Sequence, residues 1–174
     1  MRVICPYEPA IHPLCEAALD KYAPGAERRR LGPSPTAYWE LLCELWGRAE
    51  SFILIEHDVQ IHEMVLPELE NCFQPWCAFP YGGPPPHIKD TEQVLFKEAL
   101  GCTRFSASLM RDEPQMVAKL GVGMRDVERY HQWRGLDGHI GGALRGLGYD
   151  VHNHWPKVTH HHLYAAGCSC GDNH

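Results

Sequence analysis

The first sixty residues alternate between short apolar runs and segments whose apolar residues recur at helical spacing. Apolar runs at 3–5 and 51–55 predict strands. The run at 51–55 lacks alternation, as expected for a strand buried on both faces of a sheet. Helical spacing over 11–22, and again after Ser34-Pro35, which suit an N-cap and a first helical position, predicts two helices.

The order of these elements predicts the fold class. Pro6 is expected to end the first strand, and residues 26–31 form another short strand between the two helices. A strand-helix-strand-helix-strand order favours an α/β fold, Rossmann-like, with a mostly parallel twisted sheet flanked by helices. Ligands of such sheets bind outside the carboxyl ends of the strands, where the segment Glu56-His57-Asp58 falls.

The pattern beyond residue 60 is less regular. Glycine and proline at 82–86 predict a loop, either a surface connection or a lid over the site. Weaker patterns then predict, in order, a helix at 91–99, a strand at 102–105 and a helix at 113–120. Apolar spacing over 138–147 predicts a last helix, with Asp137 as its N-cap and Gly148 as its stop.

Length and composition favour one ordinary globular domain. The chain has 174 residues, of which 44% are hydrophobic and 22% charged, which suits a single folded domain over 1–174. A formal charge of -6 gives no global positive field to attract nucleic acid or an anionic membrane. The basic run at 28–30 is interpreted as solvated surface charge.

Cysteine usage and hydropathy predict a cytoplasmic protein without membrane insertion. The eight cysteines are scattered and include no C-x-x-C, which favours reduced thiols over a secreted disulfide framework. The apolar run at 3–5 is too short for a signal peptide, and no stretch approaches the ~20 apolar residues of a membrane helix. Nothing in the sequence predicts the oligomeric state.

Two polar segments are candidates for chemistry. Glu56 and Asp58, held at a strand end, can both approach one hard cation, although acids after a strand also simply begin turns. Residues 151–162 hold five of the twelve histidines, and His160 and His162 share a face if this stretch is extended. Imidazole with carboxylate suits Mn²⁺; a solvated histidine cluster or a fortuitous zinc site is the competing interpretation.

On these residues the chain resembles a small, minimal member of the GT-A-fold glycosyltransferases, which occur in bacteria and bacteriophages. Those enzymes have an apolar strand ending in an acidic loop, here 53–59. They also have a tryptophan-containing loop with an acid that opens a helix, here 133–137, and a later histidine that completes the metal shell, here His160. The chain departs from this pattern at His57 and Leu136, where further acids are common.

The resemblance implies a metal-dependent glycosyltransferase that uses a nucleotide-diphosphate sugar, expected to be a UDP-sugar. Mn²⁺ or Mg²⁺ would be bound by Asp58 with His160 or His162 and would neutralise the leaving diphosphate. Glu56 would face the ribose or base. Asp137 would be the general base for an acceptor hydroxyl in an inverting reaction.

The resemblance also divides the chain into two halves. Residues 1–60 would bind the nucleotide, with Pro6, Tyr7 and Glu8 after the first strand and Tyr7 stacked on or bonded to the base. Residues 61–174 would bind the acceptor and complete the metal site. The acceptor is open: a protein, a glycan, a lipid or a modified nucleic-acid base.

Two other functions fit the same residues. A metal-dependent hydrolase would use the histidine cluster with Asp58 or Asp137 to activate water. A non-catalytic protein would instead hold a structural zinc through Cys168, Cys170 and His174 together with upstream histidines. Zinc retention, and hydrolysis that needs no nucleotide, would distinguish the hydrolase from both alternatives.

Overall fold

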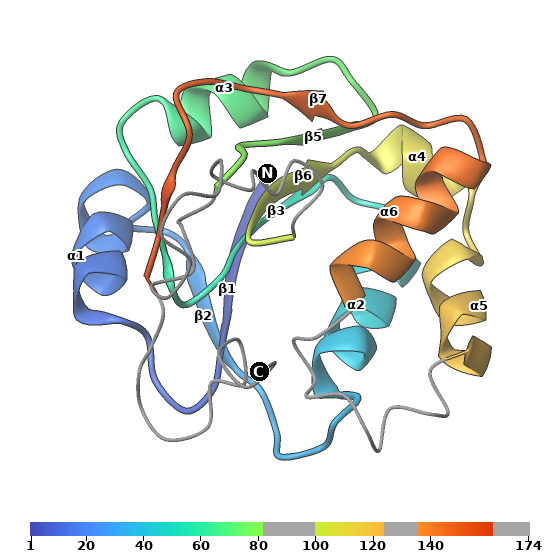
Figure 1. The fold of residues 1–174 in the computed structure, drawn as a ribbon, viewed down its shortest axis with the longest axis horizontal. Coiled ribbons are helices and arrows are strands. Elements are labelled where there is room, and N and C mark those ends of the chain that lie inside the picture. Colours follow the sequence, from blue (N-terminus) through green and yellow to red (C-terminus); the bar gives the residue numbers. More distant parts are fainter. Residues whose placement is uncertain (82–99, 124–135, 162–174) are drawn as a thin grey trace, which may run out of the picture.

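A computed structural model of the chain describes residues 1–81, 100–123 and 136–161 (Figure 1). Its helices and strands are, in chain order, β1 (Arg2–Tyr7), α1 (Pro13–Tyr22), β2 (Glu27–Arg30), α2 (Ala37–Gly47), β3 (Phe52–Ile55), β4 (Val59–Gln60), α3 (Val65–Asn71), β5 (Trp76–Ala78), β6 (Cys102–Phe105), α4 (Ala107–Asp112), α5 (Met116–Gly123), α6 (Leu136–Gly146), β7 (His152–Asn153) and β8 (Thr159–His160). No helix in these ranges has the length and apolar character that crossing a membrane requires.

Six of the strands form one sheet in the order β2-β1-β3-β6-β5-β7, and β4 pairs with β8 in a separate ladder. Strand β1 is parallel to β2 and β3, and β5 is parallel to β7. Only β6, between β3 and β5, runs antiparallel to its neighbours within this sheet. The predicted α/β class with a mostly parallel sheet flanked by helices is confirmed.

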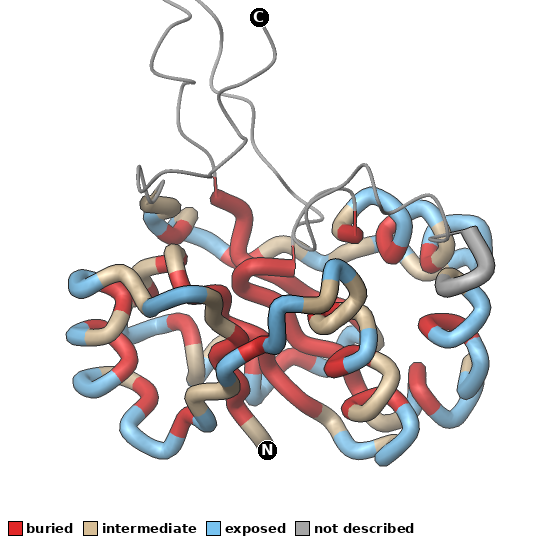
Figure 2. The backbone as a smooth tube through the Cα atoms, turned by 90° about the horizontal axis from the view of Figure 1, so that it is seen from below, coloured by how far each residue is buried: buried red, intermediate tan, exposed pale blue. Residues whose placement is uncertain are grey.

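Helices cover both faces of the sheet, and β3 lies between the two hydrophobic clusters. Phe52 and Leu54 pack in the cluster that includes residues of α2, α5 and α6. Ile53 and Ile55 pack in the opposite cluster, with residues of α1 and α3. Figure 2 shows the buried residues, coloured red, gathered at the centre of the molecule. The unbroken apolar run at 51–55 is explained by this burial on both faces.

The first strand does not end at Pro6, contrary to the expectation from sequence. Strand β1 continues to Tyr7, with Pro6 opposite Arg29 of β2. Pairing with β3 stops earlier, at Ile4. Beyond Ile4 one neighbour, β2, pairs with the strand in the part of the chain that the structure describes, so a residue without an N–H group is tolerated there.

The second helix also begins later than predicted. The carbonyl of Ser34 accepts a hydrogen bond from the N–H of Ala37, and its hydroxyl accepts one from the N–H of Thr36. Ser34, Pro35 and Thr36 therefore form a turn before α2, and Thr36 is the N-cap residue. The Thr36 hydroxyl donates to the Glu40 carboxylate at 2.7 Å.

In the later part of the chain the predicted strand at 102–105 is confirmed as β6. The predicted helix at 113–120 corresponds to α5, which begins later, at Met116; α4, which ends before Pro114, was not predicted. Ser106 caps α4 by accepting from the N–H of Leu109, and Pro114 lacks the N–H group that would continue the helix. Gly148 ends α6 with a φ of 88°, as predicted. The predicted loop at 82–86 and helix at 91–99 lie outside the described residues.

Candidate active site

A short ladder brings Asp58 and His160 together from distant parts of the sequence. Strand β4 pairs antiparallel with β8, placing Val59 opposite His160, and the N–H of His161 donates to the carbonyl of Asp58 at 2.7 Å. The ring Nε2 of His160 lies 3.0 Å from Asp58 Oδ2. Two of the three predicted metal ligands are therefore in direct contact, and the third, His162, lies outside the described residues.

Asp58 is largely buried and carries a charge. Its side chain is 17% exposed, and its Oδ1 is buried without a hydrogen-bond partner in the described part of the chain. Burial raises the pKa of Asp58, but the hydrogen bond from His160 and the charges of His160 and His57 outweigh burial and lower that pKa overall. The ring of Tyr81 packs 4.8 Å from that of His160, which fixes the imidazole from its other side.

Glu56 lies deeper, at the end of β3. Its backbone N–H donates to the carbonyl of Gly101, and its carboxyl Oε1 accepts from the Tyr38 hydroxyl at 2.7 Å. Burial raises the pKa of Glu56 well above its ordinary value, and the charges of Asp137 and Asp58 raise it further. Glu56 therefore faces the interior and α2, and its contact with a ribose or base stays a prediction.

Asp137 approaches the same acids from α6. The helix begins at Leu136, which is buried, so Asp137 lies inside the first turn and is not the N-cap that the sequence predicted. Its Oδ1 accepts from the N–H of Leu100 at 3.2 Å. Burial raises the pKa of Asp137 to about 6; Asp58 adds to this, whereas the Leu100 N–H and His160 oppose it. We call Glu56, Asp58, Asp137 and His160 the acidic site.

The residues predicted to hold the nucleotide lie at the end of β1. Pro6 is buried, whereas Tyr7 and Glu8 are partly exposed. Burial lowers the pKa of His57, and the charge of Glu8 acts in the opposite direction. Glu8 is thus near enough to the acidic loop to act on it electrostatically. Side chains from the ends of β1 and β3 therefore share one edge of the sheet, as predicted.

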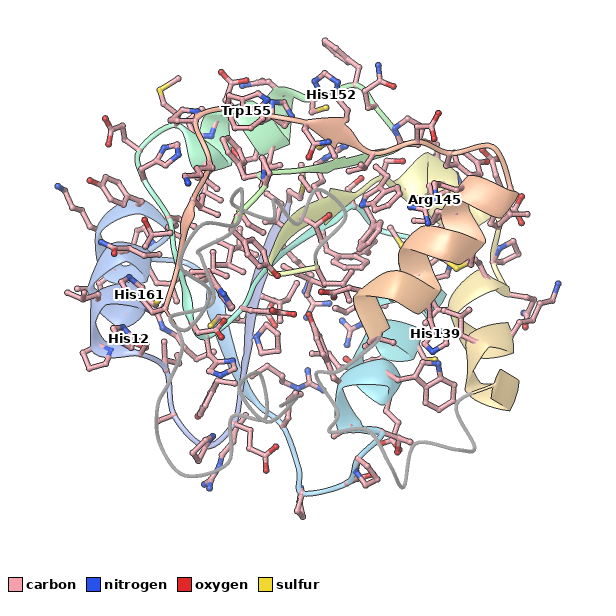
Figure 3. The ribbon with its side chains drawn as sticks, viewed as in Figure 1. His12, His139, Arg145, His152, Trp155 and His161 are labelled. Atoms are coloured by element: carbon pink, nitrogen blue, oxygen red, sulfur yellow. The ribbon has the colours of Figure 1, made fainter. Side chains whose placement is uncertain are left out.

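A second group of side chains lies beside this edge. The rings of His12 and His161 stack with centroids 4.4 Å apart, as Figure 3 shows next to α1. Cys15 completes a group whose ligand atoms all lie within 4.8 Å of one another. Burial and the charge of Asp58 raise the pKa of Cys15 to about 12, which keeps this thiol protonated.

The sequence did not identify three partners of the acidic site. Tyr38 lies on the buried face of α2, where its hydroxyl is the one signal in the sequence of another role. The Leu100 N–H is a backbone group and carries no sequence signal. Tyr81 packs so closely on Gly101 that a Cβ there would meet its hydroxyl at 2.6 Å, so this glycine accommodates the tyrosine.

No family model matches the sequence, and no curated protein sequence matches it significantly. Among solved structures, a putative glucose-1-phosphate thymidylyltransferase from Bacillus anthracis, in complex with a sucrose, is similar with a TM-score of 0.50 and 9% identity, over 92% of this chain and 89% of that one. A glycosyltransferase involved in glycosylation of the major capsid of PBCV-1 has a TM-score of 0.43 and 10% identity, over 91% and 92%. A197 from STIV has a TM-score of 0.43 and 14% identity, over 64% and 68%.

At these identities the similarity is one of fold. The chain has a Rossmann-like α/β fold similar to that of the putative thymidylyltransferase, and the expected GT-A-like architecture is supported at the level of fold alone. The comparison with the thymidylyltransferase carries this conclusion, since the other two structures are more distant. The donor, the metal and the reaction depend on the site itself.

Proposed function

We propose that this chain is a divalent-cation-dependent glycosyltransferase that takes a nucleotide-diphosphate sugar, a UDP-sugar in the first place, as donor. The observation that carries the proposal is the pairing of Asp58 with His160, with a buried Asp58 Oδ1 that lacks a hydrogen-bond partner among the described residues. This pair lies at the carboxyl edge of a mostly parallel sheet, next to Asp137 and Glu56.

The acidic site fits a cation on two grounds. Three acids act on one another electrostatically, since Asp58 raises the pKa of both Glu56 and Asp137, and a cation relieves that repulsion. Carboxylate and imidazole ligands suit Mn²⁺, and Mg²⁺ is commonly bound by one or two carboxylates together with substrate phosphates. Asp58 and His160 would hold the ion, with His162 as a third ligand; when bound, it neutralises charge on the leaving diphosphate.

Asp137 is the residue that we assign as general base. A pKa of about 6 leaves the carboxylate charged at neutral pH yet basic enough to accept a proton in the transition state. The Leu100 N–H holds Oδ1, so the carboxylate has a fixed orientation and Oδ2 would take the proton of the acceptor hydroxyl. This role requires an inverting reaction.

The end of β1 is assigned to the nucleotide. Pro6 is rigid and buried, so it fixes the position at which Tyr7 and Glu8 leave the sheet. Tyr7, which is partly exposed, would stack on the base or bond to it. The acceptor remains one of four classes: protein, glycan, lipid or modified nucleic-acid base.

Thermal unfolding in the presence of UDP and Mn²⁺ tests the proposal. Both together are expected to raise the melting temperature, since a ligand that binds the folded state stabilises it. Asp58→Ala should abolish the rise. Glu70→Ala, which removes an exposed acid of α3, should leave it unchanged. Absence of stabilisation by any nucleoside diphosphate would overturn the proposal.

A metal-dependent hydrolase is the second candidate, favoured by the group His12, Cys15 and His161 beside the same edge. This hydrolase would retain zinc through purification, and it would hydrolyse esters in the absence of a nucleotide. The raised pKa of Cys15 makes this group a weaker cation site than the charged Asp58. The transferase is therefore the better supported function.

A further inference from the structure

A second group of ligand-type side chains lies where α3 meets the edge of the sheet. Cys72 is the C-cap residue of α3, His152 belongs to β7, and His154 follows two residues later. The parallel pairing of β7 with β5, in which Cys77 is opposite His152, brings these residues together. Their ligand atoms all lie within 4.8 Å of one another, and Figure 3 shows His152 at this edge beside α3.

His154 is arranged like a metal ligand. Its side chain is 9% exposed, and Nδ1 lies 3.3 Å from Glu68 Oε2. Its other nitrogen, Nε2, is buried and has no hydrogen-bond partner among the described residues. A carboxylate on one ring nitrogen is the contact by which proteins orient a metal-bound histidine and raise its basicity. Buried polar atoms are otherwise nearly always paired, so this nitrogen calls for a partner.

We propose that Cys72, His152 and His154 bind a thiophilic transition ion, Zn²⁺ in the first place, with the fourth position left to water. Sulfur with two imidazoles is a ligand set that zinc prefers and that Mg²⁺ and Ca²⁺ do not. Zinc bonds of about 2.0–2.3 Å place tetrahedral ligand atoms about 3.3–3.6 Å apart. The ligand atoms already lie within 4.8 Å of one another, so they need to move only a little closer to bind zinc. Rotation of the exposed His152 side chain can supply this movement. We call these three residues the thiol–imidazole site.

The charges around this site fit a thiolate-bound cation. Cys72 would lose its proton on binding, and Glu68 adds a second negative charge behind His154. Arg104 is the opposing cation, and it acts electrostatically on both His154 and Cys77. Cys77, opposite His152 on β5, is not part of the group whose ligand atoms lie within 4.8 Å of one another.

A bound ion would hold the sheet edge in place. Strand β7 has two residues, and among the described strands it pairs only with β5, through Cys77 and Ala78, so this ladder is short. A metal shared by Cys72 and the two histidines would tie this strand to the end of α3. Because the ion binds the folded arrangement, it should stabilise the protein. This site is independent of the proposed transferase activity.

Metal titration of the full chain, stripped with a chelator and dialysed, tests the proposal. Co²⁺ should produce the near-ultraviolet absorption of a thiolate–cobalt bond. Added Zn²⁺ should displace the Co²⁺ and remove this absorption. Cys72→Ser should abolish that absorption, and His152→Ala, a change at an exposed position, should weaken Zn²⁺ binding at least tenfold in calorimetry. Glu68→Gln should weaken it by about 10–100-fold, as expected for an outer-shell partner.

The controls separate this site from other thiols. Cys43→Ser and Glu70→Gln should bind Zn²⁺ as the natural chain does. A variant with Cys168→Ser and Cys170→Ser should keep the cobalt absorption. Absence of a thiolate–cobalt band in the natural chain, or its persistence in Cys72→Ser, would overturn the proposal.

Discussion

The acidic site and the thiol–imidazole site both draw on the same histidine-rich segment, yet they offer different chemistry. At the first, β8 pairs with β4 and sets His160 against Asp58. At the second, β7 pairs with β5 and sets His152 and His154 near Cys72. The histidines are the shared component, so the partner strand decides whether oxygen or sulfur completes each ligand set. A count of histidines therefore cannot predict which ion a segment binds.

The two sites also differ in how they carry charge before an ion binds. The acidic site holds a charged Asp58 beside two acids with raised pKa values, so repulsion is already present. At the thiol–imidazole site an ion bound through sulfur takes the place of a thiol proton. Cation binding should therefore relieve strain between acids at the first site and release a proton at the second.

Removing one ligand from each site has the largest expected effect, and it tests whether the two sites bind different ions independently. Asp58→Asn keeps the shape of the side chain and removes its charge, and should weaken Mn²⁺-dependent UDP binding by roughly 100-fold or more, since even an outer-shell partner is worth about 10–100-fold. Zn²⁺ binding through Cys72 should be unchanged. Cys72→Ser should do the reverse. Calorimetry with each ion measures both, and a single variant that loses both ions would show that the sites are not separate.

Removing the Tyr38 hydroxyl should have the next largest effect. Tyr38→Phe leaves the buried Glu56 carboxyl without its donor, which should lower the free energy of unfolding by about 1–3 kcal/mol. Glu56→Gln is the matched change, because its amide oxygen still accepts from Tyr38 and its charge is gone. Urea denaturation should find Glu56→Gln the more stable of the two variants. Equal losses would mean that the hydrogen bond is not what holds Glu56.

The fold was predicted where contacts are local in sequence. Apolar patterns identified β1, α1, α2 and β3, because each of these elements buries a face through its own pattern. Strand β2 has no buried residue and was predicted from the turn signal before it and its place between two helices. The predicted boundaries of elements were wrong at Pro6 and Pro114. The end of β1 near Pro6 depends on which neighbouring strand still pairs with it, and the helix boundary near Pro114 depends on where a helix is capped. Those facts lie outside the segment that shows the pattern.

The candidate site was predicted in its residues more than in its contacts. Asp58 and His160 were chosen for their chemistry, but their contact depends on a two-residue ladder that spans a hundred positions of sequence. Tyr38 and the Leu100 N–H reach the acids only through the packing of α2 and the start of β6. The thiol–imidazole site was missed because Cys72 stands eighty residues before His152, and no spacing rule joins them.

Titration of Asp137 should sharpen the contrast in charge. Its folded pKa of about 6 lies above the ordinary 3.8, so the folded state binds more protons, and its contribution to stability falls as pH rises from about 4 to about 6. Asp137→Asn lacks this contribution but can still accept from Leu100. The difference in unfolding free energy between the two proteins should shift by roughly 1–3 kcal/mol across that range.

That difference is the quantity to measure, because other groups titrate too. Burial lowers the pKa of His57, His154 and His161, so their contribution to stability is lost as pH falls below their unfolded values, in both proteins alike. Urea denaturation at several pH values cancels these histidines in the comparison. If the difference in unfolding free energy does not change with pH, the pKa of Asp137 is not raised in the folded state. Saturating Mn²⁺ should shrink the slope, since a cation near the acidic site favours the charged carboxylate.

The smallest expected effect is the coupling between the two sites. Asp58→Asn and Cys72→Ser alter residues that share no partner among the described side chains, so their effects on metal-free stability should add within about 0.5 kcal/mol. The connection between them is the stretch from His154 to His160, which joins β7 to β8. A coupling well above that figure would show that this stretch moves as one body, so that filling the thiol–imidazole site also positions His160 against Asp58. A double-mutant cycle by urea denaturation, repeated with Zn²⁺ bound, distinguishes two independent sites from one linked pair.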